Sequence, residues 1–198
     1  MFAWFGTSKE HPLLILWEQT PNRMDWSFSR VIHRFLQTDA TWLLLNDADV
    51  LPETPIDEEW RFATENLAQG WAMSASPVTS VLGSLPVKTT FENIKDDRAF
   101  EVQGVVGGHW WIHRSIVERL PILAYLNNVD HTHDPLYVIV PPERSEDFDM
   151  CQRMISVGAR ICCDPRMNTL HRKNDLIPSY RKGIPIIDKS RIEAEPAP

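Results

Sequence analysis

Residues 41–49 read TWLLLNDAD, and this stretch decides how the rest of the sequence is interpreted. The apolar run over residues 41–46 has the length of a strand and is typical of a central parallel strand covered on both faces. It ends abruptly in Asp47-Ala48-Asp49. Because ligands of open α/β sheets bind at the carboxyl ends of strands, two carboxylates there favour an oxygen site for Mg²⁺ or Mn²⁺ on a diphosphate. The alternative is an acidic turn that only caps the next element.

The segments on either side of this strand alternate between helix and strand patterns. Apolar residues at i, i+3, i+4 and i+7 predict a helix over residues 26–36 with Asp25 as its N-cap. Further helices are predicted over residues 57–67 and 146–157. Strands or extended segments are predicted at residues 13–17, 71–76, 100–106, 109–113, 137–140 and 160–163. This alternation predicts an α/β sandwich with a mainly parallel sheet.

Three helix-boundary signals accompany these elements. Ser115 and Glu118 have the spacing of a capping box for a short helix, which Pro121 interrupts. Ser145 is the expected N-cap of the helix over residues 146–157, and Gly158 is its expected C′ glycine. We expect one domain over residues 1–175 and a polar, partly flexible tail over residues 176–198.

Composition excludes several classes of protein. The 198 residues carry 20 Lys and Arg against 27 Asp and Glu, a net charge of −7, which excludes binding to nucleic acid through overall charge alone. No apolar run approaches the ~18 residues of a membrane-spanning helix. Cys151, Cys162 and Cys163 contain no C-x-x-C pair, which excludes a zinc ribbon, and so few cysteines suit a reducing compartment. We therefore expect a cytoplasmic protein without a transmembrane segment.

Three further signals carry chemistry, each with a plainer alternative. The glycines in the segment GVVGG (residues 104–108) allow a ligand close to the backbone, or form a bulge or tight turn. Glu146-Asp147 begins a capped helix, whose dipole favours an ionised carboxylate that can act as a general base, or they serve helix stability alone. His171 is a candidate metal ligand or a structural histidine. The rival metal cluster, HTHD at residues 131–134, lacks a second pair of ligands.

Taken in order, these motifs resemble glycosyltransferases of the GT-A fold, particularly family 2 and its relatives. The strand that ends in DAD is followed by VVGGHWWIHRSIVERL (residues 105–120), SEDFDMCQRMISVGARICCDP (residues 145–165) and His171. The resemblance covers about residues 26–173. It implies a single GT-A-like, Rossmann-like three-layer sandwich. It also implies a metal-dependent hexosyl- or N-acetylhexosaminyl-transferase that moves a sugar from a nucleotide sugar, expected to be a UDP-sugar, to an acceptor hydroxyl with inversion.

The resemblance also implies a role for each matching residue. Asp49 would be the main metal ligand for Mn²⁺ or Mg²⁺, with Asp47 on the donor ribose or on the metal through water and His171 as a third ligand. Asp147 would be the catalytic base, and Glu146 would help to bind acceptor or donor. The remaining donor-binding residues would be Gly107, Gly108, Arg172 and Lys173.

The segments outside these motifs leave other points open. Only about 25 residues precede the first helix, so residues 13–17 stand for one strand of the usual nucleotide-binding part, with Glu18 near the base. Partner chains, including copies in a homo-oligomer, would complete the sheet. Trp110 and Trp111 shape an acceptor site, or face the core on opposite sides of a strand. The acceptor is a saccharide, a lipid-linked glycan, a protein or a modified nucleic-acid base.

Two other functions fit the same residues. A nucleotidyltransferase or nucleotide-sugar hydrolase would use the same aspartate pair with phosphate or water as the acceptor. A non-catalytic nucleotide-sugar-binding module would keep the fold without turnover. Analysis of the products and the metal dependence of nucleotide binding distinguish these functions from sugar transfer.

Overall fold

The computed structural model describes residues 24–47, 50–77, 97–105, 108–127, 133–138, 145–171 and 177–178. Its helices are α1 (Met24–Leu36), α2 (Ile56–Ala68), α3 (Arg114–Val117) and α4 (Glu146–Ser156). Its strands are β1 (Trp42–Asn46), β2 (Val50–Pro52), β3 (Met73–Ala75), β4 (Phe100–Val102), β5 (His109–His113), β6 (Ala124–Asn127), β7 (His133–Leu136), β8 (Ile161–Cys163), β9 (Thr169–His171) and β10 (Ile177–Pro178).

The main sheet has five strands in the order β1-β5-β3-β8-β4. Only β3 and β8 pair in parallel, whereas the pairs β1–β5, β5–β3 and β8–β4 are antiparallel. The fold is thus a single mixed α/β domain, and the prediction of a mainly parallel sheet is wrong. The reason is that β5 runs back between β1 and β3 and separates two strands that share a direction.

Strand β1 lies at an edge of this sheet rather than at its centre, among the strands that the structure describes. Its two faces are nevertheless both covered. Leu43 and Leu45 are buried in the main core, while Trp42 and Leu44 pack against a second apolar cluster. An apolar run with no alternation therefore indicated two covered faces, but not a central position or a parallel partner.

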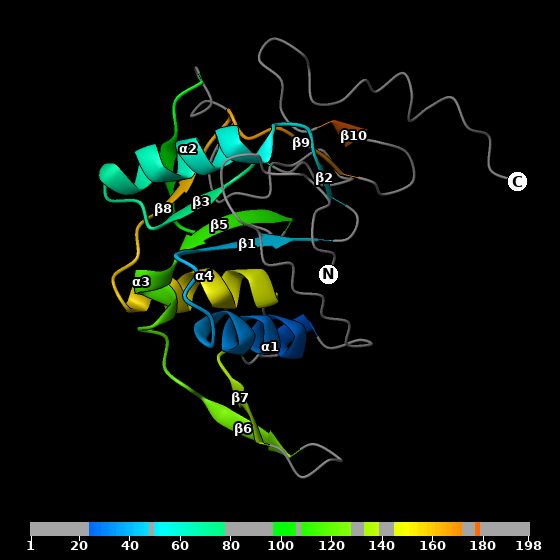
Figure 1. Cartoon of the computed structure of the whole chain (residues 1–198), viewed down its shortest axis with the longest axis vertical. Coiled ribbons are helices and arrows are strands. Elements are labelled where there is room, and N and C mark those ends of the chain that lie inside the picture. The colour runs from blue at the N-terminus through cyan, green and yellow to red at the C-terminus, as the bar shows by residue number, and fades with distance from the viewer. Residues whose placement is uncertain are drawn as a thin grey trace, which may run out of the picture.

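The sheet is packed between helices (Figure 1). Helices α1 and α4 cover one face and form the main core, in which the predicted α1 residues Phe28, Val31, Ile32 and Phe35 are buried. Helix α2 covers the other face, where Ile56 and Ala63 pack against the second cluster. The amphipathic spacing of α1 is confirmed because each helix buries one apolar stripe against the sheet.

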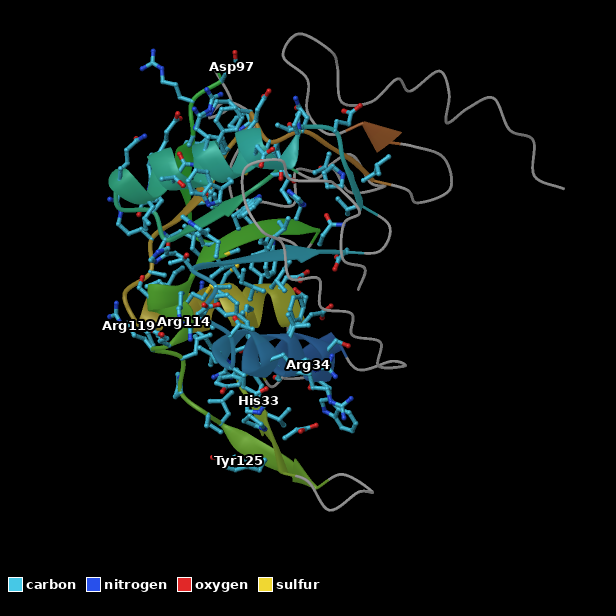
Figure 2. All side chains as sticks on the ribbon, in the orientation of Figure 1. His33, Arg34, Asp97, Arg114, Arg119 and Tyr125 are labelled. Carbon is cyan, nitrogen blue, oxygen red and sulfur yellow. The ribbon has the colours of Figure 1, made fainter. Side chains whose placement is uncertain are left out.

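Two smaller sheets complete the described structure. Strands β10, β9 and β2 form an antiparallel sheet with β9 in the middle. Strands β6 and β7 form an antiparallel hairpin that projects from the α1 side of the molecule (Figure 1). Tyr125 of this hairpin is exposed and lies away from the main sheet (Figure 2).

Several predicted boundaries are corrected by the structure. Asp25 lies inside the first turn of α1 rather than at its N-cap. His113, not Ser115, caps α3, and Glu118 pairs with Arg114 instead of completing a capping box. Residues 137 and 138 of the predicted strand at 137–140 follow β7, which ends at Leu136, and residues 139 and 140 lie outside the described residues.

Other boundaries agree with the prediction or cannot be compared. The predicted helices at residues 57–67 and 146–157 agree with α2 and α4 within a residue or so, and Ser145 is the N-cap of α4. The predicted strand at residues 13–17 lies outside the described residues, as does the tail apart from β10. No described helix has the length and apolar character needed to span a membrane.

Candidate functional site

The aspartate motif follows β1 directly, in a turn against the start of β5. The backbone N–H of Asp47 donates to the carbonyl of Gly108 at 2.7 Å, and the N–H of Val50 donates to the carbonyl of Asp47 at 3.1 Å. These bonds define the Asp47–Val50 turn. Gly108 has a φ of +143°, a conformation that other residues rarely adopt. The structure thus brings Asp47 and Gly108 together, while Asp49 lies outside the described residues.

The register of the small sheet brings His171 to the same turn. Val50 of β2 is the Cα partner of His171 in β9. Such partners in an antiparallel pair lie about 4.5–5.5 Å apart. The pairing places the backbone of His171 beside Val50, the residue that follows Asp49 in the sequence, although Asp49 itself lies outside the described residues. The His171 side chain is not among those described.

The first turn of α4 begins at the same edge of the main sheet. Strands β1, β3 and β8 point in one direction, because β5 is antiparallel to β1 and β3 and because β3 is parallel to β8. Helix α4 connects to β8 through residues 157–160 and so runs back against it (Figure 1). The N-terminus of α4 therefore lies at the edge where these three strands end.

Three acidic residues occupy that first turn of α4. Glu146 is half-buried, whereas Asp147 and Asp149 are buried. Asp149 forms an ion pair with Arg153 one turn further along the helix. The free N–H groups and the dipole at a helix N-terminus stabilise carboxylates in the ionised form, which is the form that accepts a proton.

A buried polar cluster that the sequence analysis missed lies beside the Asp47–Val50 turn. His109 is fully buried, with Nδ1 at 2.7 Å from Asn46 Oδ1 and Nε2 at 2.7 Å from Glu59 Oε2. The indole of Trp111 donates to the same Glu59 oxygen at 3.0 Å. The amide of Asn46 donates to the carbonyls of Asp47 and Val50, each at 2.9 Å. We call these four residues the buried cluster. A sequence signal was present, since a histidine follows Gly-Gly and an asparagine ends an apolar strand, but the pairing depends on topology.

The two tryptophans predicted at an acceptor site are buried. Trp110 is 1% exposed, lies in the main core and stacks on Phe28 with ring centroids 5.7 Å apart. Trp111 is 4% exposed, lies in the second cluster and meets Trp42 edge-on. The two side chains therefore face apolar clusters on opposite sides of β5, which is the alternative interpretation of the sequence. We assign neither tryptophan to an acceptor site.

Only some of the other predicted site residues lie within the described part of the chain. Glu18, Gly107, Arg172 and Lys173 lie outside the described residues. Of the rival HTHD cluster, the described Asp134 is ion-paired with Arg30 at 3.0 Å, which favours a structural role. No three described His, Cys, Asp or Glu side chains form a metal-binding group, and the side chains of Asp49 and His171 are not among those compared.

Carboxylates and an imidazole are nevertheless a suitable ligand set for Mn²⁺. The hydrogen bond between Asp47 and Val50 and the β2–β9 register bring the backbones of Asp47 and His171 near Val50. The residue types carried by these segments are therefore ones that a divalent cation binds.

The cysteines contribute no nucleophile. Burial raises the pKa of Cys151 and of Cys162 to about 12, and it raises the pKa of Cys163 well above its usual value. The reactive form of cysteine is the thiolate, which these environments disfavour.

Comparison with known proteins supports the fold and goes no further. No family model matches the chain, and no curated protein matches its sequence. Among solved structures, the crystal structure of A197 from STIV is similar, with a TM-score of 0.56 and 16% identity over 81% of this chain and 78% of that chain. At this identity the similarity shows a shared fold alone.

Proposed function

We propose that this chain is a metal-dependent glycosyltransferase, which moves a sugar from a nucleotide sugar, in the first instance a UDP-sugar, to an acceptor hydroxyl with inversion. The observation that carries the proposal is the β2–β9 register, in which Val50, the residue after Asp49, is paired with His171. This pairing joins two segments that local sequence alone does not connect, and both carry residues that the resemblance assigns to a metal.

Asp49 and His171 would hold the Mn²⁺ or Mg²⁺ ion, with Asp47 on the donor ribose or on the metal through water. The ion would neutralise the charge that develops on the leaving diphosphate. The chain itself supplies the frame, because the Asp47–Val50 turn is tied by hydrogen bonds to Gly108 and to Asn46. A site fixed in this way can hold a diphosphate without reorganising during the reaction.

Asp147 is the residue that we assign as the general base. It lies in the first turn of α4, whose N-terminus is at the same edge of the sheet as the Asp47–Val50 turn. In an inverting transfer, the base takes the proton from the acceptor hydroxyl while the acceptor oxygen bonds to the anomeric carbon. The bond between that carbon and the diphosphate oxygen breaks as the new bond forms, and the nucleoside diphosphate leaves.

The test is an assay of nucleotide release from a panel of UDP-, GDP-, CMP- and dTDP-sugars with Mn²⁺, in the presence of mixed saccharide acceptors. We expect Asp49→Asn to lower kcat/KM by more than ~100-fold, the scale set by losing several kcal/mol of transition-state stabilisation. Asp147→Asn should lower kcat by roughly 10²- to 10⁴-fold. The matched control is Asp39→Asn, an exposed aspartate before β1, which should keep full activity.

The products separate the competing functions. A glycosyltransferase releases the nucleoside diphosphate and a glycosylated acceptor. A hydrolase that cleaves the diphosphate releases a nucleoside monophosphate and a sugar phosphate, and that result would replace our proposal. Full activity in both Asp49→Asn and Asp147→Asn would also exclude it.

A further inference from the structure

The buried cluster raises a question that the proposed reaction does not answer. Glu59 comes from α2, His109 from β5 and Asn46 from β1, and these residues are 1%, 0% and 5% exposed. Burying polar side chains carries a desolvation penalty, which the hydrogen bonds among them only partly offset. Glu59 Oε1 has no hydrogen-bond partner among the described residues, which adds to that penalty. Stability alone therefore does not account for the cluster.

The amide of Asn46 fixes the direction of the hydrogen bond between Asn46 and His109. The Asn46 Nδ2 group donates to two backbone carbonyls, so Asn46 Oδ1 must be the atom that faces His109. An amide oxygen only accepts, and His109 Nδ1 is therefore a donor. At the other ring nitrogen, His109 Nε2 lies 2.7 Å from Glu59 Oε2, which also accepts from the Trp111 indole at 3.0 Å. Both ring nitrogens of His109 are therefore held by partners inside the cluster, which fixes the plane of the imidazole.

This chain of bonds ends on the backbone of the proposed metal site. Glu59 orients His109, His109 fixes the amide plane of Asn46, and Asn46 holds the carbonyls of Asp47 and Val50. Those carbonyls belong to the first and last residues of the Asp47–Val50 turn, which contains Asp49. A rigid chain of hydrogen bonds thus connects helix α2 to the turn that carries both aspartates.

We propose that Asn46, His109 and Glu59 are positioning residues, which hold the Asp47–Val50 turn in the conformation that binds the divalent cation. The inference rests on the proposed function for its metal, while the hydrogen bonds from Asn46 to the carbonyls of Asp47 and Val50 do not depend on a bound ligand. Mutation of a group that hydrogen-bonds to a metal ligand and orients it typically lowers metal affinity by roughly 10- to 100-fold. We expect an effect of that size from breaking the contact between Asn46 and the turn.

The decisive variant is Asn46→Asp, which keeps the size of the side chain and an oxygen for His109. Its second oxygen faces the carbonyls of Asp47 and Val50 and repels them, so the turn loses both donated hydrogen bonds. The added negative charge close to the site would by itself attract a cation. Positioning and simple electrostatics therefore predict opposite results, since positioning requires weaker Mn²⁺ binding and charge alone requires tighter binding.

Two measurements are made on the full chain with Mn²⁺ alone as the probe. Calorimetry gives the Mn²⁺ dissociation constant, and hydrogen exchange observed by NMR gives the protection of the Val50 amide, which donates to Asp47. We expect Asn46→Asp to weaken Mn²⁺ binding by at least ~10-fold and to increase exchange at Val50 more than at Met73, in the middle of the main sheet. Unchanged or tighter binding, with Val50 still protected, overturns the inference.

A matched control and a second variant separate positioning from a general loss of stability. Asn66→Asp makes the same chemical change at another fully buried asparagine, whose amide donates to Ser74 and Asp164 rather than to the turn. It should leave the Mn²⁺ affinity within about twofold of the wild type. If Asn46→Asp does not fold, Glu59→Gln changes the group that holds His109 while preserving its shape, and it should also weaken Mn²⁺ binding and deprotect Val50.

The wild-type protein distinguishes failure of the inference from failure of the proposed function. If the wild type binds no Mn²⁺ up to millimolar concentration, the metal-dependent function is excluded. The exchange of the Val50 amide in Asn46→Asp then decides by itself whether the cluster holds the turn. If the wild type binds Mn²⁺ and neither variant changes that affinity, only the positioning role is excluded.

Discussion

At the scale of single residues, the three cysteines offer a direct test of the packing. Cys151, Cys162 and Cys163 are all fully buried, and burial raises the pKa of each thiol, to about 12 for the first two. We predict that the native protein at pH 8 does not react with a disulfide reagent such as DTNB on the timescale of minutes. Three thiols per chain should react after unfolding in guanidinium chloride. Rapid modification of even one thiol in the native state would contradict the packing around β8 and α4.

The same scale shows where sequence reasoning stops. Glu59 lies among the acidic residues at the start of α2 and looks like part of a favourable helix N-terminus. Nothing local distinguishes it from Glu58, yet Glu58 is exposed and Glu59 is buried against His109. The difference arises because α2 presents one stripe to the sheet, at the position where β5 begins. Partnerships between buried polar groups are properties of topology, and a single sequence contains no direct record of them.

At the scale of elements, the cap of α3 makes part of the stability depend on pH. His113 Nδ1 accepts a hydrogen bond from the Ser115 N–H, which requires an unprotonated nitrogen. Desolvation lowers the pKa of His113 below its usual value near 6.5, although the charge of Glu118 acts in the opposite direction. The unfolded chain therefore binds this proton more tightly, so the contribution of His113 is complete above pH 6.5 and is lost as the pH falls through the lowered pKa.

We predict that His113→Asn reduces this pH dependence. Asparagine is a good N-cap residue and does not titrate, so the variant should keep the cap at every pH. The loss of unfolding free energy between pH 7.5 and pH 5 should be smaller than in the wild type, by no more than about 1 kcal/mol, the usual value of a cap. Urea unfolding at both pH values measures the difference. An equal loss in the two proteins would show that the His113 cap does not contribute.

The end of α4 provides a second prediction at this scale. Gly158 has a φ of +88°, and a Cβ atom placed there would lie 3.0 Å from Arg119 Nη2. Left-handed conformations cost other residues roughly 1–2 kcal/mol, with asparagine among the better tolerated. We predict that Gly158→Ala lowers the unfolding free energy by about that amount and that Gly158→Asn lowers it less. Urea unfolding at pH 7.5 measures these differences. A Gly158→Ala variant as stable as the wild type would contradict the prediction.

The elements also differ in how well sequence predicted them. Helices α1, α2 and α4 were located because their apolar spacing and their caps are local, so a short window contains the whole signal. The order and direction of the strands were not predicted correctly, because strand pairing joins segments that are far apart in the chain. The segment at residues 109–113 was recognised as extended, yet nothing in it specifies that it lies antiparallel between β1 and β3. The mixed sheet follows from that one placement.

At the scale of the whole molecule, the candidate site is assembled from segments that the fold brings to one edge. The Asp47–Val50 turn comes from the first third of the described chain, whereas the first turn of α4 and His171 come from its last third. Local pattern indicated the acidic turn and the capped helix separately. The resemblance to GT-A glycosyltransferases supplied the expectation that His171 belongs with them. The register of β2 and β9 places the backbone of His171 beside Val50, and a role for His171 at the site stays a prediction.

A site built from distant segments exists only in the folded chain, and this couples ligand binding to global unfolding. A ligand that binds only the native state, at a concentration about 100 times its dissociation constant, adds ~2.7 kcal/mol to the unfolding free energy. For a domain of this size this raises the Tm by roughly 5–10 °C.

We predict that Mn²⁺ alone raises the Tm and that one nucleotide sugar raises it further, but only when Mn²⁺ is present. Asp49→Asn should abolish both shifts because it removes the ion. Asp147→Asn should keep both, since a base that acts on the acceptor contributes little to holding metal or donor. A thermal-shift panel of UDP-, GDP-, CMP- and dTDP-sugars measures all of this. A nucleotide sugar that stabilises the protein equally with and without Mn²⁺ would instead favour the non-catalytic binding module.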